Sequence, residues 1–149
     1  RLRVIGSRER FSDRLNRQIV DAEKLTQSGV LNLHLYVDYG GRWEIAQAAK
    51  KMAENIEDGS LESKDICAES IDSYFSIEGL SAPDLCIRTA GEQRISNFML
   101  WQMAYAELYF TDCYWPDFDQ NAFESAIEDY YSRQRRFGAR SSDHQSNNK

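Results

Sequence analysis

A short loop that carries two arginines is the feature of this sequence with the clearest chemistry. An apolar run over Leu85–Ile87 ends at Arg88, and Arg94 and Ser96 follow closely. Guanidinium groups bind phosphate oxygens through paired hydrogen bonds, and the free N–H groups at the start of a helix attract phosphate. We therefore predict an anion site large enough for a diphosphate at Arg88, Arg94 and Ser96.

A strand and a helix must position these side chains. The run Asp84–Arg88 has the apolar composition of a buried strand, which would deliver Arg88 at its carboxyl end, where open α/β sheets bind ligands. Ser96 has the side chain of a helix N-cap, so we expect a helix over Ser96–Tyr105. On spacing alone, Arg88 also suits a solvated strand end and Ser96 a plain structural cap.

Two acidic residues, Asp84 and Glu92, flank the loop. We expect them to orient Arg88 and Arg94 by ion pairing, or to cap local backbone donors. A direct part in catalysis is not expected, because a carboxylate beside a diphosphate is repelled. The sequence therefore assigns ligand-binding residues to this chain and no catalytic residue.

Apolar spacing elsewhere alternates between the strand and the helix period. The sequence predicts strands over 2–6, 30–37 and 84–88, and helices over 8–27, 43–58, 64–75 and, with Asp119 as cap, to about 133. This alternation predicts an α/β fold with a parallel sheet flanked by helices. Three strands are few for a sheet covered on both faces, so we expect the sheet to be incomplete in this chain. The polar tail over 139–149 is expected to be disordered.

Composition limits the classes of function. The net charge of −6 argues against a nucleic-acid binder, and no apolar run reaches membrane-spanning length. Cys67, Cys86 and Cys113 share no metal-ligand spacing, and we interpret them as the reduced thiols of a cytoplasmic protein. His34 and His144 do not form a histidine metal site. No Gly-x-x-x-x-Gly-Lys loop supports nucleotide binding.

Motifs that follow one another along the chain resemble those of the cis-prenyltransferase family, to which the undecaprenyl diphosphate synthases belong. The resemblance covers Arg1 to Gly138 and predicts one domain over 1–138. It is specific because many positions match in order. These positions are Tyr39-Gly40-Gly41-Arg42, Asp84-Leu85-x-Ile87-Arg88-Thr89-x-Gly91-Glu92-x-Arg94-x-Ser96-Asn97-Phe98, Leu100-Trp101-Gln102, Ala104-Tyr105-x-Glu107-x-x-Phe110, Trp115-Pro116-Asp117-Phe118 and Arg135-Arg136-Phe137-Gly138.

The resemblance implies an enzyme, a prenyltransferase. It would condense isopentenyl diphosphate with a farnesyl-type allylic diphosphate, with Mg²⁺ as cofactor, to give a long polyprenyl diphosphate such as undecaprenyl diphosphate. It also implies a homodimer in the cytoplasm, with peripheral membrane contact through the lipid product. The aromatic residues between Trp101 and Phe118 are expected to pack in the core and between subunits rather than to bind the prenyl chain.

The family also implies roles for single residues. Arg88, Arg94 and Ser96 would hold the diphosphate of isopentenyl diphosphate, and Glu107 would help to hold Mg²⁺ beside it. Arg136 would reach the same substrate across the dimer interface. Without the resemblance, Glu107 is a surface glutamate on or near the end of the expected helix, and Arg136 belongs to a basic helix end that suits the helix dipole.

Two departures from the family pattern qualify this interpretation. The Asp-Gly-Asn-Gly-Arg-Trp motif of the allylic site does not occur, so we expect the C-terminal portion of a synthase, which carries the isopentenyl diphosphate half and is inactive alone. The alternative is a non-catalytic prenyltransferase-like subunit. Family members show Asn-x-x-x-Asn before Tyr-Gly-Gly, whereas this chain has His34 and Asp38, which changes local hydrogen bonding.

Overall fold

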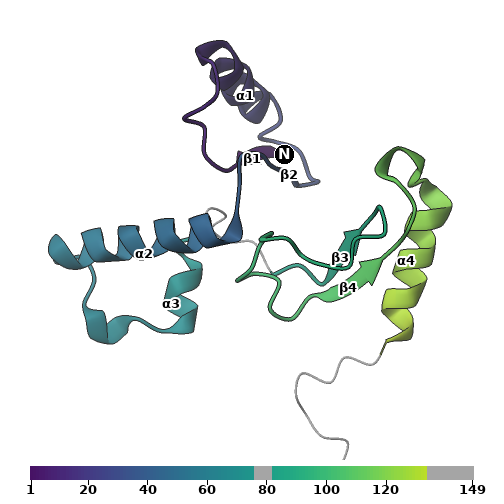
Figure 1. Ribbon diagram of the computed structural model, residues 1–149. Coiled ribbons are helices and arrows are strands. Elements are labelled where there is room, and N and C mark those ends of the chain that lie inside the picture. The colour runs from purple at the N-terminus through teal and green to yellow at the C-terminus, as the bar shows by residue number, and fades with distance from the viewer. Residues whose placement is uncertain (76–81, 134–149) are drawn as a thin grey trace, which may run out of the picture. The chain divides into compact units, whose positions relative to one another are not determined.

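The computed structural model describes residues 1–75 and 82–133 (Figure 1). The chain divides into two compact units, each of which is described by itself. Of the described residues, the first unit holds 1–75 and 96–101, and the second holds 82–95 and 102–133. The first holds β1 (Leu2–Ile5), α1 (Asp13–Leu25), β2 (Leu33–Tyr36), α2 (Gly41–Glu57), a 3-10 turn (Ser63–Asp65) and α3 (Ala68–Asp72). The second holds β3 (Leu85–Arg88), β4 (Glu107–Phe110), a 3-10 turn (Trp115–Asp117) and α4 (Gln120–Ser132). Within the described ranges, no helix is both long and apolar enough to cross a membrane.

The first unit begins with a strand–helix–strand arrangement. β1 and β2 pair in parallel, in register from Leu2 with Leu33 to Ile5 with Tyr36. α1 packs against β1, and Ile19 of the helix is buried together with Ile5. The parallel α/β arrangement that the sequence predicts is therefore confirmed.

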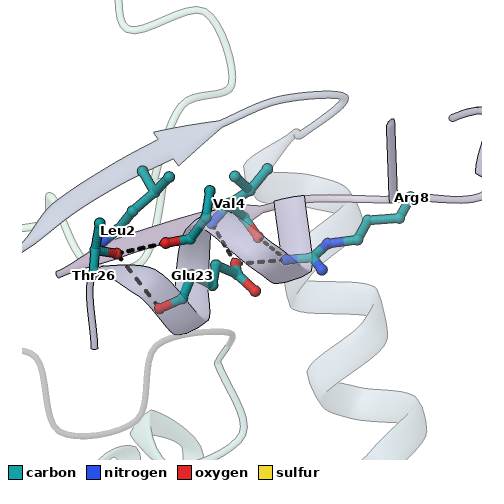
Figure 2. A network of polar contacts seen from close by, with 6 residues as sticks. Leu2, Val4, Arg8, Glu23 and Thr26 are labelled. Carbon is teal, nitrogen blue, oxygen red and sulfur yellow. Dashed lines mark hydrogen bonds and ion pairs between the residues drawn. The ribbon is translucent and has the colours of Figure 1, made fainter. Parts of the chain in front are cut away.

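Side chains from α1 and from the residues on either side of it close the outer edge of β1, which is the edge turned away from β2 (Figure 2). Thr26 Oγ1 accepts the Leu2 N–H at 2.9 Å. Glu23 Oε1 accepts the Val4 N–H at 2.9 Å and the Arg8 guanidinium at 2.8 Å, and Arg8 also donates to the Val4 carbonyl at 2.7 Å. Burial opposes the charge of Glu23, but these donors outweigh it and hold the pKa of Glu23 below its ordinary value.

A buried carboxylate lies in the first turn of α2. Glu44 is only 2% exposed, and the Tyr39 hydroxyl donates to its Oε2 at 2.5 Å. The ring of Tyr36 contacts that of Tyr39 edge-on, with centroids 4.7 Å apart. Burial, together with the charge of Glu44, raises the pKa of Tyr36 to about 12 and also raises that of Tyr39.

The second unit contains a strand that the sequence analysis did not anticipate. β3 and β4 pair in parallel, in register from Leu85 with Glu107 to Arg88 with Phe110. α4 packs against β4, and the Asp119 carboxylate caps it by accepting a backbone N–H at 2.9 Å, as expected.

The prediction of a helix over Ser96–Tyr105 is wrong. These residues form turns, and Ser96, Asn97 and Met99 have φ values of 46°, 66° and 44°. A right-handed helix cannot contain such left-handed values, so Ser96 is not a helix N-cap. Smaller corrections concern element ends: α1 begins at Asp13, β2 is limited to Leu33–Tyr36, and the helix expected over 64–75 is a 3-10 turn followed by α3. The tail over 139–149 lies outside the described residues.

Replacing Glu23 with Gln should lower the free energy of unfolding at pH 7 by about 1.5–3 kcal/mol, the usual worth of hydrogen bonds to a charged group. The folded state lowers the pKa of Glu23, so its contribution is present above the ordinary value and is lost as pH falls through the folded-state value. The difference between wild type and variant should therefore shrink below about pH 4. Urea unfolding at pH 7 and pH 3 checks this, with the exposed Glu9→Gln as control. An equal difference at both pH values would contradict it.

Glu44→Gln should lower the pKa of Tyr36 from about 12 toward its ordinary value, because it removes the nearby charge. The shift should be partial, since burial, the larger cause, remains. Titration of the tyrosine ring carbons by NMR measures it. Glu54→Gln, an exposed change on the same helix, should leave Tyr36 unaffected. A Tyr36 pKa that is the same in wild type and Glu44→Gln would remove Glu44 as a cause.

Candidate functional site

The loop after β3 is anchored to the segment that follows β4. Arg88 ends β3, and beyond it the Ala90 N–H donates to the Cys113 carbonyl at 2.8 Å and the Gly91 N–H to the Thr111 carbonyl at 2.9 Å. Ala90 and Gly91 have φ values of 68° and 70°, so the chain turns there through left-handed backbone. The loop thus has a fixed start at the carboxyl end of the strand pair.

The structure brings the two predicted arginines into this one loop. The Arg88 guanidinium donates to the Arg94 carbonyl, and the Arg94 guanidinium pairs with the Glu92 carboxylate. The ion pair between Arg94 and Glu92 is thus present, while a role of Glu92 in orienting Arg94 for a ligand stays a prediction. The Asp84 carbonyl accepts the Glu107 N–H at 2.9 Å, while pairing of the Asp84 carboxylate with an arginine stays a prediction.

The charges of the loop suit a strongly anionic ligand. The side chain of Arg94 is 64% exposed and that of Glu92 41%, so their ion pair contributes roughly 0–1 kcal/mol. A diphosphate carries more charge than one carboxylate and can compete for Arg94. Because the whole chain has a net charge of −6, the attraction must come from this local concentration of guanidinium groups.

Neither of the other two predicted diphosphate ligands belongs to the described residues of the second unit. Ser96 belongs to the first unit, where it is exposed and begins the turns that run to Trp101. Arg136 lies outside the described residues. Of the four predicted ligands, the loop of the second unit therefore contains Arg88 and Arg94.

Glu107, the predicted metal ligand, begins β4 rather than ending a helix. Its Oε2 accepts the Arg133 guanidinium at 2.8 Å, and Arg133 also pairs with Asp129 at 2.6 Å. The hydrogen bond to Glu107 is the main reason why the pKa of Arg133 is raised. In the strand register the backbone of Glu107 pairs with that of Leu85, which is three residues before Arg88. Its backbone therefore lies about 10 Å along the strand pair from Arg88. The structure therefore does not place Glu107 next to Arg88.

The donor set gives a limited fit to magnesium. In the ranges that the structure describes, no group of three or more His, Cys, Asp or Glu residues is arranged to hold a metal ion. Glu107 offers one carboxylate, one oxygen of which is held by Arg133. Mg²⁺ often binds one or two carboxylates together with substrate phosphate oxygens. These residues thus fit a metal ion that is bound mainly by a diphosphate, and do not form a metal site by themselves.

Sequence reasoning missed the partners that hold these residues. The sequence places Arg133 only near the end of the last expected helix, and its contact with Glu107 depends on a strand that was not predicted. Asp38, whose substitution was expected to alter hydrogen bonding, has a φ of 51° and pairs with Arg10. The hydrogen bond from Arg10 lowers the pKa of Asp38. The spacing between Arg10 and Asp38 carries no local signal of this pairing.

Comparison with known sequences agrees with this arrangement of motifs. The family described as "Putative undecaprenyl diphosphate synthase" matches residues 1–138. The ditrans,polycis-undecaprenyl-diphosphate synthase ((2E,6E)-farnesyl-diphosphate specific) of Yersinia pseudotuberculosis is 52% identical over 139 residues, which are 93% of this chain and 55% of the relative. The enzyme of the same name from Escherichia coli K12 is 48% identical over the same shares. The chain therefore spans about half the length of the curated relatives it matches.

Solved structures show the same relationship. A lavandulyl diphosphate synthase from Lavandula x intermedia, in complex with dimethylallyl diphosphate, superposes with a TM-score of 0.88 at 39% identity, over 93% of this chain and 60% of that one. A probable undecaprenyl diphosphate synthase from Campylobacter jejuni gives a TM-score of 0.79 at 34% identity, over 93% and 62%. The match over residues 1–138 and these relatives show that the chain belongs to the undecaprenyl diphosphate synthase family of prenyltransferases.

Proposed function

We propose that this chain supplies the isopentenyl diphosphate half-site of a cis-prenyltransferase. The enzyme would condense isopentenyl diphosphate with a farnesyl-type allylic diphosphate and extend it to undecaprenyl diphosphate. The observation that carries the proposal is the anchored loop that holds Arg88 and Arg94 together. The relatives at 48–52% identity, which are named as farnesyl-diphosphate-specific synthases, support the choice of substrates.

The condensation needs two substrates held in a fixed relation. The C1–O bond of the allylic diphosphate breaks, and the diphosphate leaves with the electron pair. C4 of isopentenyl diphosphate forms a bond to C1, and C2 then loses a proton. Arg88, Arg94 and Ser96 would bind the diphosphate of isopentenyl diphosphate and so aim C4 at the allylic carbon, which is catalysis by positioning.

Magnesium is proposed to enter with a substrate diphosphate. When bound, it supplies positive charge that neutralises the phosphate oxygens. Glu107 would contribute one carboxylate oxygen, and Arg133 would hold the other in place. This division agrees with the position of Glu107, which offers a single carboxylate with one oxygen already bonded to Arg133.

A homodimer completes the proposal. Tyr114 and Trp115 are 66% and 76% exposed in the second unit, and Trp115 stacks on Phe118 with ring centroids 6.3 Å apart. Exposed aromatic side chains of this kind are enriched at protein interfaces. Arg136 would then reach the isopentenyl diphosphate site of the partner subunit. The lipid product would bring the enzyme into peripheral contact with a membrane.

Arg88→Ala and Arg94→Ala should each weaken isopentenyl diphosphate binding by about 10- to 100-fold, since a hydrogen bond to a charged group contributes roughly 1.5–3 kcal/mol. Titration calorimetry of the folded chain with isopentenyl diphosphate measures this. Arg17→Ala, an exposed change on α1, is the control for loss of one positive charge. Affinities that remain at the wild-type value in both loop variants would refute the site.

Glu107→Gln should raise the Mg²⁺ concentration that half-saturates metal-dependent isopentenyl diphosphate binding by about tenfold, as expected for loss of a charged metal partner. Arg133→Gln separates the two roles of Glu107, because it breaks the ion pair and leaves the carboxylate. If Arg133→Gln shifts the magnesium titration as far as Glu107→Gln does, the effect belongs to the ion pair. A titration of Glu107→Gln that superimposes on wild type would reject the metal role.

A further inference from the structure

The N-terminus of α2 is capped by a residue far away in the sequence. Gly40 precedes the helix and has no side chain that could accept a hydrogen bond. The Asn97 backbone carbonyl accepts the Gly41 N–H at 2.6 Å, and its side-chain Oδ1 accepts the Arg42 N–H at 2.8 Å. One residue thus satisfies two of the N–H groups that the start of a helix leaves without internal partners.

The glycine pair at the start of α2, Gly40 and Gly41, makes this contact possible. A Cβ atom on Gly41 would lie 2.7 Å from Leu100 Cγ and 2.9 Å from the Leu100 backbone nitrogen, and one on Gly40 would lie 2.6 Å from Asn97 Nδ2. Gly41 has no left-handed backbone that would itself require glycine. Its missing side chain is therefore needed for the close approach of the segment that follows Ser96.

The docked segment has strained backbone and a second attachment. Ser96, Asn97 and Met99 are left-handed, and such residues persist only where the surrounding structure holds them. Phe98 supplies the second attachment, because its ring contacts that of Tyr36 at a centroid distance of 5.1 Å. The segment is therefore held by a cap and by aromatic packing within the first unit.

We propose that Asn97, docked against Gly41, is a positioning residue that fixes Ser96 for the diphosphate. The role of Ser96 itself rests on the proposed function. Ser96 is bonded directly to Asn97, so a firm cap limits how far the Ser96 hydroxyl can move. The proposed diphosphate site does not use the Gly40–Gly41 motif, and this docking gives the motif a structural role. It accepts a docked segment, and the N–H groups of Gly41 and Arg42 bind Asn97 rather than phosphate.

Asn97→Gly tests the cap. Glycine tolerates the φ of 66°, so the change removes the side-chain acceptor without adding backbone strain. Amide exchange at Arg42, followed by NMR, should become about threefold to tenfold faster, as expected for one lost hydrogen bond. Asn97→Asp retains an acceptor and should restore protection, and Asn32→Gly makes the same change at an exposed loop residue. Unchanged exchange at Arg42 in Asn97→Gly would overturn the cap.

Gly41→Ala tests the close approach independently. It keeps every hydrogen-bonding group and adds one methyl group that meets Leu100. Helix propensity alone favours alanine over glycine, so it predicts slower exchange in the first turn of α2. The proposal predicts faster exchange at Arg42, because the methyl group pushes the docked segment away.

Titration with isopentenyl diphosphate tests the positioning role. Asn97→Gly should raise Kd about threefold to tenfold in samples with wild-type circular dichroism, in line with one perturbed hydrogen bond to the ligand. A purely structural cap would lower the melting temperature and leave Kd unchanged, which would overturn the positioning role. If Arg88→Ala weakens binding and Asn97→Gly does not, the proposed function stands and this inference fails. If wild type does not bind, the proposed function and the positioning role both fail, and the exchange data still judge the cap.

Discussion

The start of α2 imposes a strict local constraint on the first unit. A helix start leaves N–H groups without internal partners, and here the acceptor comes from Asn97 instead of a neighbour in the sequence. Capping by Asn97 brings the backbone near Leu100 so close to α2 that residue 41 must be glycine. It also holds the left-handed residues Ser96, Asn97 and Met99 in place. The buried Glu44 lies in the first turn of α2, where the helix dipole favours its negative charge.

The two units use charge in different ways. In the first unit, Glu23 is shielded and serves backbone donors, so its charge contributes to the stability of the strand–helix contact. In the second unit, Arg94 and Glu92 form an exposed pair that contributes little to stability and can exchange partners. An acidic protein can bind an anion in this manner, because the Arg94 guanidinium stays exposed and its ion pair with Glu92 is weak.

Periodicity was enough to predict the regular elements. Strand and helix spacing located β1, α1, α2 and α4, and Asp119 correctly marked the start of the last helix. The prediction failed between Ser96 and Phe110, where Ser96 suggested the N-cap of a helix but a series of turns and then a four-residue strand follow. Tertiary contacts decide that segment, since Asn97 docks on a helix that begins more than fifty residues earlier.

In the candidate site, too, local sequence predicts some features and tertiary contacts decide the others. Residue types alone were enough to name Arg88 and Arg94 as candidate ligands, because a strand end and a loop are local features. The contacts of Glu107 were not predictable, because Arg133 reaches it only once α4 packs on β4. A sequence pattern names the groups that can bind a ligand, whereas their partners follow from the packing of elements distant in the chain.

Because the outer edge of β1 is closed, an additional strand can pair more easily at the other edge of this two-stranded sheet. The outward N–H groups of Leu2 and Val4 are already bound by Thr26 and Glu23, so an incoming strand would have to displace both side chains before it could pair there. β2 carries Leu33, which is 53% exposed, and has no such cover among the contacts described. Strand addition to this unit, whether by another segment or by a second molecule in an aggregate, is therefore directed to β2.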